Sequence, residues 1–219
     1  GDGPFRRAVI AARERGVVKG YIENTRMTLP NKGTKLDIEG AVGAKGRISV
    51  IKDLGLKEPY TGNSELVKGD IASDFAVYFT LSEQKPSAIM IGEYYDGISI
   101  LACGGLFVQR LAGCDDFLIT AVQDALEAFT DFGRILYEHK DADAVIKKYF
   151  GGFYIKKIAE YEPRFACSCG DGRAEDIIRL IGKKEAGEII EEIGKIEVRC
   201  DFCGKKHEYS KEDVYKLFN

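Results

Sequence analysis

The sequence lacks any apolar run that approaches the ~18 residues of a membrane-spanning helix. Its first segment, GDGPFRRAVIAARERG, also lacks the charged-then-apolar order of a secretory signal. These two absences predict a cytoplasmic protein that has no membrane partner.

The sequence also lacks an excess of charge of one sign. It has 32 basic and 35 acidic residues, and the part from Arg164 onward is as nearly balanced as the part before it. Proteins that bind nucleic acid usually concentrate positive charge on one part of the chain, because neutralising phosphates supplies much of their affinity. We therefore expect no nucleic-acid partner.

Catalytic motifs are scarce as well. There are two histidines, His139 and His207, and neither has a nucleophile near it in sequence. No glycine-rich segment matches a phosphate-binding loop, and the pair Asp115-Asp116 is typical of a solvated helix face. The sequence thus predicts that the protein is not an enzyme.

Cysteine is the residue type that stands out. Four of the six cysteines form two motifs near the C-terminus, Cys-x-Cys at Cys167 and Cys169 and Cys-x-x-Cys at Cys200 and Cys203. Paired cysteines in tight turns are the usual ligands of tetrahedral zinc, and cysteines of cytoplasmic proteins more often bind metal than form structural disulfides. We therefore predict one Zn²⁺ per chain.

Other roles for these cysteines stay open. The zinc could be a permanent structural clip for a small module, or Cys200 and Cys203 could be a disulfide oxidoreductase motif. The second is disfavoured because this pair does not follow a strand within a βαβ pattern. His207 could replace one sulfur ligand, but we expect it on an exposed strand beside two lysines.

The close spacing of the thiols also permits a redox switch. Zinc-bound thiolates remain nucleophilic, and peroxide can convert one to a sulfenic acid that a neighbouring thiol resolves. Oxidation would release the metal and withdraw about 10–16 kcal/mol of apparent binding free energy from the module. We expect a module that small to unfold as a result.

Local patterns predict the secondary structure. Strands are expected over 17–24 and 47–55, a helix over 69–87, a hairpin that turns at Asp96-Gly97, and helices within 115–150. Two short helices that break near Gly182 should precede a hairpin whose turn holds the second cysteine pair. A capping box, Ser210 with Asp213, should open a last helix. Residues 6–16 suit a helix or a strand equally well.

The remaining glycines and cysteines give weaker signals. Gly104 and Gly105 indicate a bulge or a close backbone approach in the second strand of the hairpin. Cys103 is expected to be buried in the same strand. Cys114 should be a poorly reactive thiol because two aspartates follow it.

Three features together resemble the 33 kDa chaperonin family of redox-regulated heat-shock holdases. They are the two cysteine motifs, the segment DLGLKEPYTGNSELVKGDIASDFAVYFTLSEQKPSA and the strand CGGLFVQ. The resemblance implies an α+β fold with an N-terminal α/β sandwich-like core domain (1–114), a helical linker (115–162) and a small C-terminal zinc-binding module (163–219). The core domain is expected to be incomplete, because GDGPF normally follows a further N-terminal region.

The same resemblance implies a mechanism. Cys167, Cys169, Cys200 and Cys203 would bind zinc in the reduced, inactive state, and oxidation would form the disulfides Cys167–Cys169 and Cys200–Cys203. The zinc-free protein would then dimerise and bind unfolding client proteins without ATP. The alternative is a zinc-ribbon module that binds nucleic acid or protein and keeps its zinc permanently.

Client binding requires apolar surface that is hidden in the resting state. The candidates are apolar side chains of the helical linker and of the segment that follows it, and they would be ordinary core until the module melts. They are Leu118, Val122, Leu126, Phe129, Phe132, Phe150, Phe153 and Tyr154.

Overall fold

A computed structural model describes residues 1–29, 31–32 and 35–218 of the chain. The chain forms two compact units. The first unit consists of Gly1–Arg7 and Glu23–Ile158, and the second consists of Ala8–Ile22 together with 159–218. A short N-terminal segment therefore belongs to the same unit as the C-terminal cysteines.

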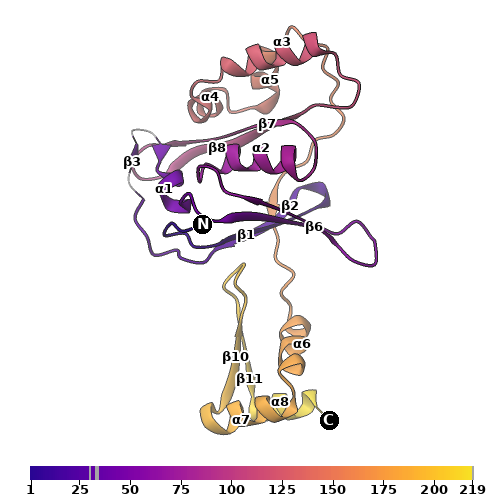
Figure 1. Ribbon diagram of the computed structural model, residues 1–219. Helices are drawn as coiled ribbons and strands as arrows, with labels where there is room; N and C mark the ends of the chain where they lie inside the picture. Colours follow the sequence, from indigo (N-terminus) through magenta and orange to yellow (C-terminus); the bar gives the residue numbers. More distant parts are fainter. Residues whose placement is uncertain (30, 33–34, 219) are drawn as a thin grey trace. The chain divides into compact units, whose positions relative to one another are not determined.

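Helices and strands are mixed along the chain (Figure 1). The strands are β1 (Ala8–Arg13), β2 (Val17–Ile22), β3 (Asn31–Lys32), β4 (Lys35–Leu36), β5 (Arg47–Lys52), β6 (Tyr60–Glu65), β7 (Ser87–Tyr95), β8 (Ile100–Gln109), β9 (Arg164–Phe165), β10 (Lys195–Arg199) and β11 (Lys206–Ser210). The helices are α1 (Ile38–Val42), α2 (Ile71–Leu81), α3 (Asp116–Glu127), α4 (Phe132–His139), α5 (Ala142–Phe150), α6 (Asp171–Ile181), α7 (Lys183–Ile193) and α8 (Lys211–Leu217), with a 3-10 turn, η1 (Glu14–Gly16). This mixture confirms the α+β class.

The antiparallel hairpin β7–β8 is the central element of the first unit. Its turn forms at the predicted Asp96-Gly97 pair, where the Asp96 carboxylate accepts hydrogen bonds from the backbone N–H groups of Ile98 (2.8 Å) and Ser99 (2.7 Å). The turn spans 96–99 and is therefore wider than the tight two-residue turn that the pair predicts. In Figure 1, α2 lies on one side of this hairpin and α3, α4 and α5 lie on the other.

Glycines allow α4 to approach the hairpin closely. A Cβ atom on Gly92 would lie 2.6 Å from the backbone nitrogen of Gly133, and one on Gly104 would lie 2.9 Å from a methyl carbon of Leu136. The close approach predicted at Gly104 is thus confirmed, while the register shift of the hairpin lies at Tyr94 and Tyr95 instead.

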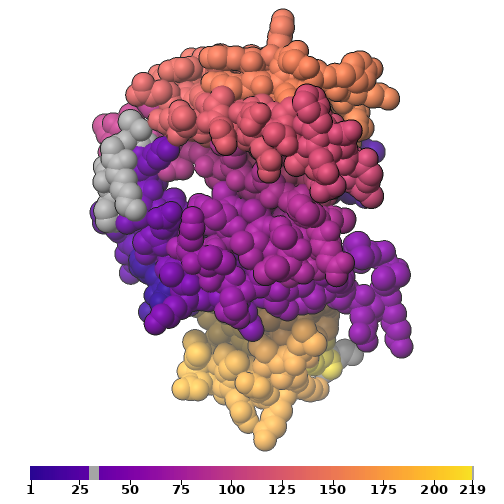
Figure 2. Space-filling view, turned by 45° about the horizontal axis from the view of Figure 1, so that its top comes forward, coloured from indigo at the N-terminus to yellow at the C-terminus, as the bar shows by residue number. Residues whose placement is uncertain are grey.

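The predicted helical segment is divided into three helices, each begun by an aspartate. The carboxylates of Asp115, Asp131 and Asp141 accept hydrogen bonds from N–H groups of the first turns of α3, α4 and α5. In Figure 2 the atoms of the three helices lie together at one end of their unit. Their buried cluster contains Phe129, Phe132, Ile135, Val145 and Phe150.

The second unit contains two sheets. β1 and β2 form an antiparallel hairpin, so residues 8–13 are a strand, and β9 pairs in parallel with β2. β10 and β11 form the predicted hairpin, and Ser210 and Asp213 form the predicted capping box at the start of α8. The helices α6, α7 and α8 pack with β10 and β11 around one cluster. Its buried members are Ala174, Ile178, Ala186, Ile190, Ile196, Tyr209 and Val214.

In the part of the chain that the structure describes, every helix is too short or too polar to cross a membrane.

Asp74 is the most completely buried charged residue of the first unit, and it holds the loop before α2. Its carboxylate accepts hydrogen bonds from the backbone N–H groups of Val67 (2.7 Å), Lys68 (3.1 Å) and Gly69 (2.9 Å). We predict that Asp74→Ala lowers the free energy of unfolding by about 3 kcal/mol, because three backbone donors lose their acceptor. Urea unfolding followed by circular dichroism measures the change.

The control is Asp53→Ala, which removes a single hydrogen bond to the backbone N–H of Gly55 in an exposed loop. This substitution should lower the free energy of unfolding by less than about 1 kcal/mol. Equal stabilities of the two variants would show that Asp74 does not anchor the loop.

Candidate metal centre

The four cysteines of the two sequence motifs converge in the second unit. Their Sγ atoms all lie within 4.8 Å of one another. The shortest distances join the two motifs, with 3.6 Å between Cys167 and Cys200 and 3.1 Å between Cys169 and Cys203. Two chain segments far apart in sequence therefore meet at one cluster of sulfur atoms.

The Cys-x-Cys motif lies between β9 and α6. Cys167 follows β9 by two residues, and Cys169 precedes the first residue of α6, Asp171, by two. Asp171 is held by β11, because its carboxylate lies 2.7 Å from Nδ1 of His207 and its carbonyl accepts a hydrogen bond from the Tyr209 hydroxyl (3.0 Å). These contacts fix the start of α6, and with it the position of Cys169.

The Cys-x-x-Cys motif forms the turn between β10 and β11. The backbone N–H of Cys200 donates to the carbonyl of Lys205 (2.9 Å), and the N–H of Gly204 donates back to the carbonyl of Cys200 (2.8 Å). Gly204 has a φ of +71°, in the left-handed region that favours glycine. This closed turn directs both sulfurs toward the same point.

The turn also gives the thiols of the cluster different pKa values. Burial alone would raise the pKa of Cys200, but hydrogen bonds from the backbone N–H of Cys203 and from the thiols of Cys167 and Cys169 lower it to about 7. The pKa of Cys169 rises to about 12, chiefly because its thiol hydrogen-bonds to Cys203 and also to Cys167. In the metal-free cluster Cys200 therefore ionises before Cys169.

The cluster has the dimensions of a tetrahedral thiolate site. A Zn–S distance of about 2.3 Å places neighbouring ligand sulfurs about 3.8 Å apart, close to the observed separations. Soft thiolate ligands select Zn²⁺, Cu⁺ or iron–sulfur clusters over harder cations. These four residues therefore fit a bound soft metal ion, which would also offset the repulsion between the thiolates.

Two sequence expectations about residues outside the sulfur cluster are wrong. His207 is buried rather than exposed, because its ring packs against the start of α6 and pairs with Asp171, and it is not part of the sulfur cluster. Cys103 is exposed rather than buried, because strand β8 alternates and places it on the face opposite Gly104, which approaches Leu136 of α4. Cys114 is half-buried in the loop before α3.

The eight candidate client-binding residues differ widely in exposure. Phe129, Phe132 and Phe150 are buried, and Val122, Leu126 and Phe153 pack partly buried against them. Leu118 is 44% exposed and Tyr154 is 97% exposed. The candidates thus include both core residues and apolar side chains that are already at the surface.

Sequence reasoning missed one aromatic residue of the site. Phe202 lies between the two cysteines of the turn, and its ring packs edge-on against Tyr21 of β2, with ring centroids 5.1 Å apart. The ammonium group of Lys19 lies 4.3 Å from the centroid of the same ring. An aromatic residue inside a Cys-x-x-Cys turn could have suggested such a contact, although not its partner.

The unequal acidities predict an order of thiol modification. At pH 7 about half of the Cys200 thiols of the metal-free, reduced protein should be ionised, so iodoacetamide should alkylate Cys200 before Cys169. The rate at Cys200 should rise with pH around a midpoint near 7. Peptide mapping by mass spectrometry after short exposures measures both rates, and Cys114 is an internal reference. Preferential alkylation of Cys169 would contradict the assignment.

Comparisons with known proteins agree with this geometry. The family described as "Hsp33 protein" matches residues 1–210. The "33 kDa chaperonin" of Alkaliphilus oremlandii is 37% identical over 219 residues, which are 99% of this chain and 73% of the relative. The protein of the same name from Clostridium botulinum (strain Eklund 17B) is 38% identical over 220 residues, which are 99% of this chain and 74% of the relative. The crystal structure of the 33 kDa chaperonin (heat shock protein 33 homolog) of Thermotoga maritima superposes with a TM-score of 0.86 at 31% identity, over 99% of this chain and 74% of that one. The chain therefore belongs to the Hsp33 family of chaperones.

Proposed function

We propose that this chaperone is a holdase that works without ATP and is switched on by oxidation in the cytoplasm. In the reduced state Cys167, Cys169, Cys200 and Cys203 bind one Zn²⁺ and the protein is inactive. Oxidation forms the disulfides Cys167–Cys169 and Cys200–Cys203, zinc leaves, and the protein dimerises and binds unfolding proteins. The observation that carries this proposal is the convergence of all four thiols within 4.8 Å.

The oxidation step balances with peroxide as the oxidant. A thiolate attacks the O–O bond to give a sulfenic acid and releases water after protonation, and a second thiol displaces a further water from the sulfenic sulfur to form the disulfide. Each disulfide thus consumes one peroxide and two thiols and yields two waters. Zinc is released because a disulfide sulfur is no longer a thiolate ligand.

The proposed disulfides join neighbours in sequence, although the shortest sulfur distances in the cluster join the two motifs. Once the metal leaves and the module unfolds, the two motifs are connected only through the stretch of chain that includes α6, α7 and β10. Bringing distant segments together costs more chain entropy than joining residues one or two positions apart. The local pairs are therefore favoured in the opened state.

The first prediction from this function couples metal to activity. Peroxide at mildly elevated temperature should release one zinc per chain as four thiols disappear, and suppression of client aggregation should rise in step. Zinc is measured with a colorimetric chelator, thiols by titration with a disulfide reagent, and aggregation by light scattering of a thermally unfolding enzyme.

The control is the double variant Cys103→Ser, Cys114→Ser, whose cysteines lie outside the sulfur cluster. It should release zinc and gain activity as the unchanged protein does. Reduced, zinc-loaded protein that suppresses aggregation equally well would exclude the switch. Zinc that stays bound after peroxide would instead indicate a permanent structural site.

The second prediction concerns the exposed apolar candidates. We infer that Leu118 and Tyr154 contact clients, because both are exposed and because each is a near neighbour along the chain of a residue, Val122 or Phe153, that packs on the buried aromatic cluster. Replacing both with Ser should weaken client binding by the oxidised protein severalfold while the melting temperature changes little. Phe129→Ser is the contrasting variant, because removing a buried ring should cost about 3–5 kcal/mol of stability. Unchanged binding by the Leu118 and Tyr154 variant would remove both residues from the client site.

A further inference from the structure

The strand β2 contacts both halves of the sulfur cluster. It is the middle strand of the sheet β1-β2-β9, so one edge pairs with β1 and the other is covered by β9, which leads directly to Cys167. The side chains of Lys19 and Tyr21, on one face of β2, hold the ring of Phe202 in the Cys-x-x-Cys turn. A hairpin from the N-terminal part of the chain is therefore attached to each cysteine motif.

β9 pairs with the edge of β2 over only a short length. The parallel ladder consists of two residue pairs, Val17 with Arg164 and Val18 with Phe165, and one further hydrogen bond runs from the Ala166 N–H to the Val18 carbonyl (3.1 Å). Phe165 stays 58% exposed although it is paired. So short a ladder contributes little to the stability of the β2–β9 contact, because each backbone hydrogen bond adds only about 1 kcal/mol.

The packing beneath this cover is incomplete as well. A partly open pocket of about 120 Å³ lies where β9 and the first cysteine meet the hairpin, and its lining residues are Ala11, Arg13, Val17, Val18, Lys19, Ala166, Cys167 and Ser168. Side chains on the pocket side have no packing partner there, so the contact gains less from dispersion than a filled core does. The position of β9 therefore depends strongly on the anchoring of Cys167.

The hairpin itself does not depend on the cysteines. Six residue pairs join β1 and β2, from Ala8–Ile22 to Arg13–Val17. At its base the Glu23 N–H donates to the Arg7 carbonyl (2.8 Å), and the Arg7 guanidinium lies 3.5 Å from the Glu23 carboxylate. Loss of the sulfur cluster would therefore free β9 and Phe202 while the hairpin remains formed, with one open edge.

We propose that the open edge of β2 is a docking strand for extended polypeptide segments, which take the place of β9 when the sulfur cluster is oxidised. An exposed strand edge offers a row of unpaired N–H and C=O groups, and an extended peptide can pair with it whatever its sequence. This inference rests on the proposed holdase function and names the surface that binds the client. Its ligand is the backbone of an unfolded chain.

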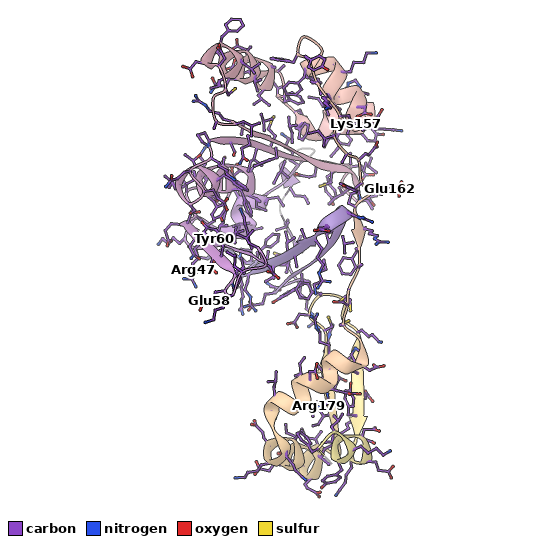
Figure 3. All side chains as sticks on the ribbon, turned by 90° about the vertical axis from the view of Figure 1, so that its right-hand side faces the viewer. Arg47, Glu58, Tyr60, Lys157, Glu162 and Arg179 are labelled. Atoms are coloured by element: carbon purple, nitrogen blue, oxygen red, sulfur yellow. The ribbon has the colours of Figure 1, made fainter. Side chains whose placement is uncertain are left out.

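The basic residues beside this edge indicate which client segments it prefers. Glu160 and Glu162 precede β9, and Glu162 lies on the extended segment that enters the strand (Figure 3). The main chain at Glu162 passes so close to the hairpin turn that a Cβ atom on Gly16 would lie 2.9 Å from its carbonyl oxygen. The turn and β2 carry Arg15 and Lys19. Client segments that combine apolar residues with carboxylates should therefore bind best.

The hydrogen-bond pattern of the hairpin provides a matched pair of test variants. In an antiparallel pair, residues alternate between those that direct their N–H and C=O groups at the partner strand and those that direct them away. The Val18 carbonyl accepts from Ala166, so Val18 directs its backbone groups at β9, and Ala12, its partner in β1, directs its own groups at the outer edge of β1. Val18→Pro removes a donor from the docking edge, and Ala12→Pro makes the same change on the opposite edge of the same hairpin.

The test compares client binding by the unchanged chain and the two variants after peroxide treatment and measured zinc release. The probe is reduced, carboxymethylated α-lactalbumin, a permanently unfolded and acidic chain, with affinity measured by fluorescence anisotropy. We expect Val18→Pro to weaken binding about tenfold, as the loss of one or two backbone hydrogen bonds predicts, and Ala12→Pro to change it less than about twofold. Hydrogen exchange should show the Val18 amide protected in the zinc-bound protein, exposed after oxidation, and protected again when the probe is bound.

The outcomes separate this inference from the function on which it rests. If the oxidised, unchanged chain binds the probe but both variants bind equally well, the docking edge is wrong and the holdase function stands. If both variants weaken probe binding equally, the docking edge is also wrong, because the loss would then come from damage to the whole hairpin. If the unchanged chain loses zinc and binds no probe, the holdase function fails and the docking edge fails with it.

Discussion

The convergence of four sulfur atoms is the constraint that joins the two cysteine motifs of the second unit and the elements attached to them. Each motif is shaped locally, one between β9 and α6 and the other in the turn between β10 and β11, and beside the sulfurs the contacts of Asp171 with β11 also link them. Four thiolates at these distances repel one another unless a cation lies among them, so the same atoms that join the segments also make the junction conditional. A change in the charge or bonding of sulfur therefore reaches every element that the junction holds.

The second unit is stabilised differently at its two ends. Ile178, Ile190 and Val214 belong to an apolar cluster formed by α6, α7, α8 and the hairpin β10–β11, and this cluster contains none of the cysteines. Around the cysteines the contacts are mostly polar or short: a two-pair ladder with one further hydrogen bond, the contacts of Asp171 with His207 and Tyr209, one aromatic pair and a cation over a ring. Local stability follows the density of buried apolar contacts, so the sulfur end should open at a lower free-energy cost than the apolar end. An oxidant that acts on the cysteines thus acts where the unit is weakest.

Local signals in the sequence predict much of this arrangement. The features that they do not predict are contacts between residues distant in sequence. The position of the Asp96-Gly97 turn, the capping box of Ser210 and the break at Gly182 are each determined by residues within a few positions, and the local sequence predicts all three, although not the width of the turn. The pairing of Val18 with Phe165 gives no local signal, because a parallel ladder between distant segments leaves no mark on either one alone. His207 was placed wrongly for the same reason, since its partner Asp171 lies on another element and its neighbours in sequence are lysines.

An open strand edge is a hazard for a soluble protein, because it pairs with any extended chain, including another copy of itself. For a protein that binds unfolded chains, the same property is useful, provided that the edge is covered until it is needed. A long, well-packed covering strand would be too stable to leave, and no covering strand would expose the edge permanently. A two-residue strand anchored by a neighbouring cysteine would satisfy both requirements, because with a metal bound most of the free energy that keeps it in place would come from the sulfur cluster rather than from the ladder. The weakness of the pairing between β2 and β9 is therefore what would allow a change at sulfur to control access to the strand.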